Sequence, residues 1–297
     1  MKLLNFKKNG QVRLGVLTAA GVVDIAAAAQ AFELEAPSDI HELLESGSAG
    51  LAAADATAAQ AVEVRSESYI FPESSIEYAP SVTKPAKIIC VGLNYRKHAE
   101  ETNAPIPEYP ILFNKFSNTL ASQGDTVLLP KTSKEVDYEA ELVIVIGKRA
   151  KDVSEEQALD YVFGYSNSND LSARDLQMRT HQWMLGKCCD GFTPLGPYIV
   201  TTDEVGDPND LTIRCTVNGE VRQSSHTSDM IFNCKEIISY ISRHMTLEPG
   251  DIILTGTPEG VVLGYPADKR VYLQDGDVVT IEIEKLGSLT VTMKQEV

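Results

Sequence analysis

The sequence has little positive charge for its size and lacks any long apolar run. It holds 26 lysines and arginines against 42 aspartates and glutamates, a formal net charge of −16 at pH 7. This balance argues against nucleic acid or an anionic membrane as a partner, because both are polyanions. No stretch approaches the roughly 20 apolar residues that a membrane-spanning helix needs.

Secretion and sulfur-metal signals are also missing. The apolar stretch in the opening MKLLNFKKNG is too short for a signal peptide. The chain has an odd number of cysteines without metal-type spacing, Cys90, Cys188, Cys189, Cys215 and Cys234. We therefore expect reduced thiols, no zinc site and a cytoplasmic protein.

Common signatures of nucleotide binding and of serine hydrolases are absent as well. There is no G-x-G-x-x-G or Walker sequence and no G-x-S-x-G. These absences argue against a doubly wound nucleotide-binding fold and against a serine-hydrolase triad of the esterase type.

The strand and helix patterns predict an α+β protein in two parts. Residues 1–35 have the pattern of short strands, the Ala-rich segment 48–62 that of a helix, and 69–85 is a Pro- and Ser-bearing linker. We predict a small N-terminal α+β domain over 1–75 and a larger domain over 76–297. Long β stretches with few helices favour a mixed-sheet roll or barrel for the larger domain.

Helices of the larger domain are predicted from their capping residues. The candidates are Asn94 for a helix over 95–102, Ser154 for one over 155–162 and Asn233 at the start of one over 233–244. An Asn-Gly pair at 218–219 predicts a hairpin.

Three acids alternate at the start of the apolar strand VDYEAELVIVIGK, residues 136–148. Asp137, Glu139 and Glu141 would point to the same face of that strand. Such a cluster is costly to bury unless a cation offsets its charge. Glu139 and Glu141, with Asp170 as a third ligand, would form an all-oxygen site for Mg²⁺ or Mn²⁺. The alternative is a solvated strand end.

A histidine and a glutamate lie three positions apart in the predicted helix 95–102. His98 and Glu101 would share a face of it, so that the carboxylate can orient the imidazole as a general base for water. The alternative is an exposed helix of mixed charge.

Two further segments could bind an anion. Lys187 stands in the turn-rich WMLGKCCDGFTPLGP, where it could meet an anionic substrate or a developing oxyanion, or be a surface lysine. Thr257, in LTGTPEGV, could hold a carboxylate together with free backbone N–H groups, or the segment could be only a tight turn.

Five segments occur in the order of a known family: IICVGLNYRKHAEE, DYEAELVIVIGK, VFGYSNSNDLSARDLQ, GKCCDGFTPLGP and LEPGDIILTGTPEGV. They span about 85–262, and together they resemble the fumarylacetoacetate hydrolase family. The resemblance implies a mixed β-roll domain, a homodimer, and Mg²⁺ or Mn²⁺ in the site.

The resemblance also implies roles for individual residues. It makes Glu139, Glu141 and Asp170 the metal ligands, His98 and Glu101 the catalytic pair, Lys187 a catalytic lysine, and Arg174, Gln177 and Thr257 substrate-binding residues. Asp137 matches no ligand position and is interpreted as a flanking acid. The animal enzyme that names the family has an additional metal-binding aspartate where this chain has Val91, which argues against fumarylacetoacetate as the substrate.

The activity that the resemblance implies is metal-dependent cleavage of a C–C bond in a small 2-oxo acid. Acylpyruvate hydrolysis and oxaloacetate decarboxylation would share a metal-stabilised enolate. The alternatives are hydrolysis of diketo sugar acids, isomerisation of hydroxymuconate-type acids and, last, a non-catalytic member that binds a metabolite or a protein.

Overall fold

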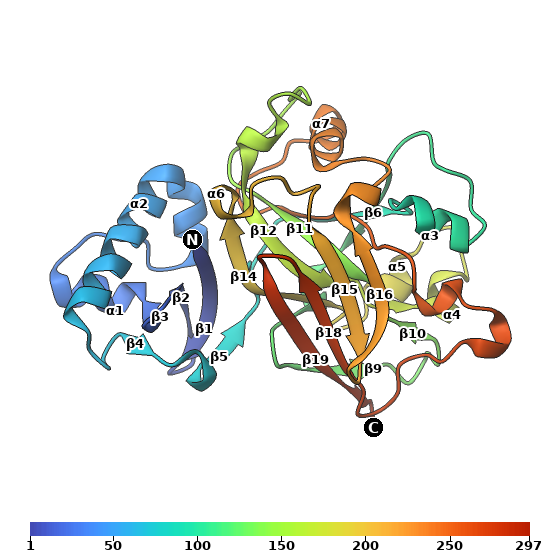
Figure 1. Cartoon of the computed structure of the whole chain (residues 1–297), viewed down its shortest axis with the longest axis horizontal. Helices are drawn as coiled ribbons and strands as arrows, with labels where there is room; N and C mark the ends of the chain where they lie inside the picture. Colours follow the sequence, from blue (N-terminus) through green and yellow to red (C-terminus); the bar gives the residue numbers. More distant parts are fainter.

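The computed structural model describes the whole chain, residues 1–297, and is built around two large β-sheets (Figure 1). The larger sheet has twelve strands, and ten of them follow one another across it. Their order is β4 (Ile70–Phe71), β3 (Gly21–Asp24), β2 (Gln11–Thr18), β1 (Lys2–Lys8), β14 (Thr193–Thr201), β12 (Val162–Asn169), β11 (Ala140–Ile146), β17 (Ile252–Leu254), β6 (Ile88–Gly92) and β7 (Ile111–Lys115). The two others are β5 (Glu77–Ala79), beside β1, and β8 (Leu120–Ala121), beside β14.

The second sheet packs against the first and has five strands. Their order is β16 (Glu220–His226), β15 (Thr212–Val217), β18 (Val278–Ile283), β19 (Gly287–Gln295) and β9 (Thr126–Leu129). A short pair, β10 (Val136–Asp137) and β13 (Ser172–Ala173), lies apart. Parallel and antiparallel neighbours occur in both large sheets. The predicted mixed-sheet α+β fold is therefore confirmed, and neither sheet closes into a barrel.

The N-terminal strands carry two helices on one side, α1 (Ile25–Phe32) and α2 (Ile40–Val64), and form the blue lobe of Figure 1. The second half of α2 is the predicted Ala-rich helix, and Gly47, with φ 56°, marks a kink before it. Strand β1 pairs with β14, where Leu3 lies opposite Ile199, so the sheet continues from this lobe into the rest of the molecule.

The remaining helices are α3 (Arg96–Glu101), α4 (Arg174–Gln177), α5 (Met184–Lys187), α6 (Thr202–Val205) and α7 (Cys234–His244). The prediction for α7 is confirmed, since Asn233 and Glu236 form a complete capping box at its start. The hairpin at 218–219 is confirmed as the turn between β15 and β16. No helix is both long enough and apolar enough to cross a membrane.

The predicted helix over 155–162 is wrong. Only a single 3₁₀ turn, Ala158–Tyr161, forms there, and Ser154 contributes its carbonyl instead of a side-chain cap. Strand β12 begins at Val162, directly after this turn, so the chain has no room for a further helical turn.

Asn94 does not cap α3, so that prediction is wrong as well. Tyr95 occupies the cap position without a side-chain hydrogen bond. The buried Asn94 amide instead donates to the carbonyl of Phe232 at 3.0 Å and to that of Thr255 at 2.7 Å. Asn94 thus fixes the corner between β6 and α3 against the end of β17.

Candidate active site

Three buried carboxylates meet where β11 begins and β12 ends. Glu139, Glu141 and Asp170 each offer an oxygen within 4.8 Å of the others. The antiparallel register places Ala140 opposite Asn169, and the Asp170 N–H donates to the Glu139 carbonyl at 2.9 Å. Because all three are at most 6% exposed, the alternative of a solvated strand end does not hold.

Three buried cations surround these acids. Lys187 Nζ lies 2.7 Å from Glu139 Oε2 and 2.7 Å from Asp170 Oδ2. Arg174 Nη2 lies 2.7 Å from Glu139 Oε1. Lys187 is 1% exposed, so it is not a surface lysine.

The third cation, Lys115, was missed by the sequence reasoning. Its Nζ donates to Asp170 Oδ1 at 2.5 Å and to the carbonyl of Phe192 at 2.6 Å. The one signal for it is that Lys115 is the lone charged residue in the short strand segment ILFNK. A single lysine at the end of a strand is usually exposed, and only the fold shows that this one is buried.

The surroundings of Glu139 and Glu141 shift the pKa values of these two glutamates in opposite directions. Burial alone would raise the pKa of Glu139, but the charges of Lys187 and Arg174 outweigh burial and lower its pKa to about 2. Burial, together with the charges of Asp170 and Glu139, raises the pKa of Glu141 well above its usual value. Glu141 is therefore the acid that lacks a cationic partner; its Oε2 accepts only the Gly256 N–H, at 2.7 Å.

The donor set fits a hard divalent cation. With Asp137 included, four buried carboxylates face the three buried cations Lys115, Arg174 and Lys187, which leaves one negative charge when all are ionised. Carboxylate oxygens without nearby sulfur or imidazole ligands are what Mg²⁺ and Mn²⁺ prefer. Glu139, Glu141 and Asp170 could hold such an ion, and Asp137 lies outside their group.

The predicted general-base pair also forms. On α3, His98 Nδ1 lies 2.7 Å from Glu101 Oε1, and His98 is 8% exposed. The other carboxylate oxygen of Glu101 accepts the Gly260 N–H at 2.9 Å. The alternative of a solvated helix of mixed charge therefore does not hold for these two residues.

A cavity of about 220 Å³ connects the acids to the pair. Of the predicted site residues, it is lined by His98, Glu139, Glu141, Arg174, Gln177, Lys187 and Thr257. Asp170 and Glu101 are not among its lining residues, although each contacts one that is. The lining also includes apolar residues, among them Phe113 and Trp183, whose rings pack edge to face.

All three predicted substrate-binding residues already have hydrogen-bond partners. Arg174 Nη1 donates to Gln177 Oε1 at 3.0 Å, both on α4. The Thr257 hydroxyl accepts from Gln223 Nε2 at 2.9 Å, and Gln223 was not found from the sequence. The structure thus brings all nine predicted residues together, while their roles stay predictions.

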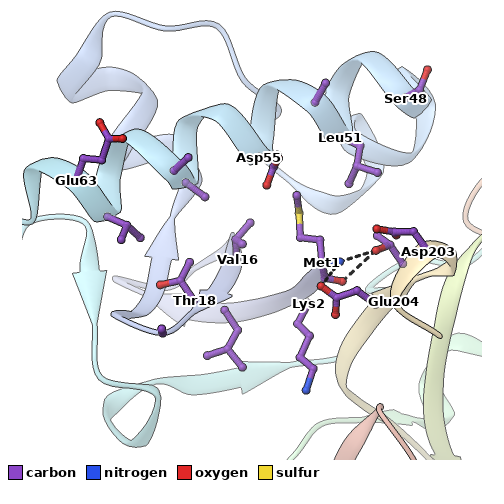
Figure 2. Close-up of a pocket in the computed structure, with 17 residues that line it drawn as sticks. Met1, Lys2, Val16, Thr18, Ser48, Leu51, Asp55, Glu63, Asp203 and Glu204 are labelled. Atoms are coloured by element: carbon purple, nitrogen blue, oxygen red, sulfur yellow. Dashed lines mark hydrogen bonds and ion pairs between the residues drawn. The ribbon is translucent and has the colours of Figure 1, made fainter. Parts of the chain in front are cut away.

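A larger groove of about 1040 Å³ lies elsewhere, between α2 and α6 (Figure 2). Leu51 and Asp55 of α2 face it from one side, and Asp203 and Glu204 of α6 from another. It contains none of the three clustered acids, which form the chain's one candidate metal group. The smaller cavity, which Glu139 and Glu141 line, is therefore the candidate active site.

Two features identify the class of this protein: its mixed sheets, and a buried carboxylate triad beside a His–Glu pair. Residues 87–294 match the family model described as fumarylacetoacetate (FAA) hydrolase C-terminal. The chain belongs to the fumarylacetoacetate hydrolase family, as the sequence motifs indicated.

Individual relatives support the same assignment. The chain is 45% identical over 269 residues to the mitochondrial oxaloacetate tautomerase FAHD2A of Bos taurus, covering 90% of this chain and 82% of that protein. It is 41% identical over 296 residues to the mitochondrial oxaloacetate tautomerase fahd2 of Xenopus laevis, covering 98% and 89%.

Similar solved structures include complexes with manganese(II) and pyruvate. Maleylpyruvate hydrolase from Sphingobium sp. SYK-6, in complex with manganese(II) and pyruvate, has a TM-score of 0.80 and 30% sequence identity. The similarity covers 100% of both chains.

Proposed function

We propose that the protein is a divalent-metal-dependent enzyme that interconverts the enol and keto forms of oxaloacetate. One observation carries the proposal: a carboxylate triad, part of a buried cluster with one excess negative charge, lies at the same small cavity as the imidazole of a His–Glu pair. Such a site can bind a cation and an anionic 2-oxo acid together, and it can move a proton. The two oxaloacetate tautomerases, at 41% and 45% identity, favour oxaloacetate as the substrate.

Glu139, Glu141 and Asp170 would hold Mg²⁺ or Mn²⁺. When bound, the cation would supply positive charge that polarises the 2-oxo group and favours the enolate. Arg174 and Lys187 place two more cationic groups on the same cavity, where they can attract carboxylate and developing oxyanion charge. Gln177 and Thr257 supply further polar contacts for orientation.

The proton transfer belongs to His98. Its Nδ1 faces Glu101, which leaves Nε2 as the ring nitrogen available to a substrate in the cavity. In this proposal Nε2 takes a proton from C3 of the keto form, which leaves the enolate, and the enolate oxygen is protonated from water to give the enol. In the reverse direction the enol loses its O–H proton to water, and the protonated ring returns a proton to C3 of the enolate. Glu101 fixes the orientation of the ring.

A second candidate is cleavage of a C–C bond in a 2-oxo acid, by acylpyruvate hydrolysis or oxaloacetate decarboxylation. The same His98–Glu101 pair could deprotonate water for the hydrolysis. The similarity to maleylpyruvate hydrolase favours this candidate. Both reactions pass through an enolate, so one cavity could serve either.

A substrate panel separates the two candidates. Purified protein is given enol oxaloacetate, whose loss is followed by ultraviolet absorbance, and acylpyruvates in parallel, with CO₂ release recorded. Each assay runs with Mg²⁺, with Mn²⁺ and with chelator, and with His98→Ala. We expect metal-dependent and His98-dependent ketonisation to exceed both cleavage reactions. Faster cleavage than ketonisation would favour the second candidate, and activity unchanged by chelator would contradict both.

A further inference from the structure

Asp137 is a fully buried carboxylate that is linked to the active site through the guanidinium of Arg174. Its Oδ2 lies 2.9 Å from Arg174 Nε and 2.8 Å from Arg174 Nη2. The guanidinium is thereby held between Asp137 on one side and Glu139 Oε1 on the other. Burial alone would lower the pKa of Arg174, but the charges of Asp137 and Glu139 raise it above its usual value, so the group stays a cation.

The same carboxylate also holds a backbone segment. Asp137 Oδ1 accepts the Val262 N–H at 2.9 Å, and Oδ2 accepts the Leu263 N–H at 3.1 Å. Two residues earlier, the Gly260 N–H donates to Glu101. The next residue after Asp137, Tyr138, donates its hydroxyl to the Gly260 carbonyl at 3.1 Å. Segment 260–263 is thus tied to β10 and to the general-base pair at once.

We propose that Asp137 is a positioning residue, whose single carboxylate fixes both the Arg174 guanidinium and segment 260–263 in the active site. Asp137 was interpreted from the sequence as a flanking acid, and the candidate metal group does leave it out. β10 ends at Asp137 and β11 starts at Ala140, so Asp137 and Glu141 belong to different strands. Its effect on substrate rests on the proposed function; its effect on Arg174 and on the segment does not.

Asp137 can hold both Arg174 and segment 260–263 because several donors face its one carboxylate. Asp137 accepts hydrogen bonds from Arg174 Nε and from two backbone N–H groups, and Arg174 Nη2 forms an ion pair with it. Asparagine at this position would keep one oxygen, but its NH₂ group would face a donor. Arg174 would lose its ion pair with residue 137 and be drawn to Glu139 alone, which is a predicted metal ligand.

The first experiment needs neither metal nor substrate. In protein with ¹⁵N-labelled arginine, the buried Nε–H of Arg174 should give a slowly exchanging signal, assigned by its loss in Arg174→Gln. Hydrogen exchange of the peptide that contains 260–263 is measured in parallel. In Asp137→Asn we expect the Nε–H to exchange at least about tenfold faster, because a charge-assisted hydrogen bond is lost, and the segment to lose protection. Unchanged exchange at both places would overturn the proposal.

Asp251 offers a matched control. It is also fully buried, and it pairs with Lys87 at 2.8 Å and accepts two backbone N–H groups, from Lys87 and Glu248. It does not line the cavity. Asp251→Asn should destabilise the protein without changing exchange at Arg174 Nε or in 260–263. Equal changes in both variants would show general loosening and overturn the proposal.

The second experiment measures the consequence for ligand binding. The chain's one tryptophan, Trp183, lines the cavity, so its fluorescence can report a titration with pyruvate in the presence of Mg²⁺. We expect Asp137→Asn to weaken pyruvate binding about tenfold in a wild-type background and to have no further effect in Arg174→Gln. Multiplicative losses in the double variant would overturn the link through Arg174. If the wild-type protein binds no pyruvate, the proposed function is contradicted, and the exchange measurements still decide the role of Asp137.

Discussion

Glu101 Oε1 lies 2.7 Å from His98 Nδ1, one turn away on α3. The contact fixes the imidazole so that its other nitrogen serves the cavity. Neither residue is hydrogen-bonded to a metal acid, and the second partner of Glu101 is the Gly260 N–H. The general-base pair therefore has no direct hydrogen bond to the metal acids and can be tested separately from them.

Glu101→Gln should reduce turnover about 10- to 100-fold and leave Mg²⁺ affinity unchanged. Glutamine can still accept the imidazole N–H, but it cannot stabilise a positive charge on the ring. Glu100→Gln, an exposed neighbour on the same helix, is the matched control and should keep full activity. Initial rates and Mg²⁺ titrations check both variants, and a loss of metal binding in Glu101→Gln would contradict the assignment.

Gly264 leaves space for the Glu101 carboxylate. A Cβ atom at position 264 would lie 2.5 Å from Cδ of Glu101, far inside contact distance. Because that carboxylate is the end of a flexible side chain, Gly264→Ala should displace it and leave the fold intact. We expect turnover to fall about as far as in Glu101→Gln, with a thermal midpoint close to wild type.

A second background isolates the cause of that loss. In Glu101→Ala the carboxylate is absent, so Gly264→Ala should have no further effect on turnover. A further loss of similar size there would show that the alanine acts on something other than Glu101.

The sequence predicted the site better than it predicted local structure around the site. Glu139 and Glu141 could be paired because a strand has a period of two, and the capping box at Asn233 is a local signal. Asn94 and Ser154 also fit local capping rules, but each was overridden by tertiary context. Asn94 is bonded to distant backbone groups, and the start of β12 ends the turn that follows Ser154.

Lys115 and Asp137 could not be placed from the sequence for a related reason. Whether a charged residue is buried depends on which elements pack over it, and no periodic pattern records that. Lys115 meets Asp170 across 55 residues, and Asp137 meets Leu263 across 126. Such long-range ion pairs and hydrogen bonds become visible only in the folded chain.

Lys187→Met should make the stability of the protein depend strongly on metal. Removing the ammonium leaves Glu139 Oε2 and Asp170 Oδ2 buried without that cation. Breaking a buried pair on one side typically costs about 3–5 kcal/mol of unfolding free energy. We expect a lower thermal midpoint in chelator and a larger upward shift on Mg²⁺ addition than in wild type.

Lys97→Met, at an exposed position of α3, is the control and should respond to Mg²⁺ like the wild-type protein. Thermal unfolding with and without Mg²⁺ measures the difference. If Mg²⁺ stabilises Lys187→Met no more than wild type, then Lys187 does not neutralise the acids that hold the metal.

The raised pKa of Glu141 predicts how the metal-free protein responds to pH. A carboxyl whose pKa is higher in the folded state stabilises the fold fully below its unfolded value, about 4.3, and this stability is lost as pH rises through the folded pKa. Glu139 has the opposite sign: with a pKa of about 2, its stabilisation is present above about 4.3 and is lost only at more acidic pH. The two effects therefore separate along the pH axis.

Glu141→Gln removes the titration and keeps an oxygen that can accept the Gly256 N–H. In chelator, the thermal midpoint of this variant should rise relative to that of wild type as pH increases from about 4 to about 8. Mg²⁺ should abolish this relative rise, since the cation favours the ionised Glu141 and its binding displaces the proton.

Calorimetric Mg²⁺ titrations in buffers of different ionisation enthalpy should then show proton release in wild type and less in Glu141→Gln. A pH-independent difference in thermal midpoint would contradict the raised pKa, and Mg²⁺ binding of wild-type strength in Glu141→Gln would remove Glu141 from the ligand set.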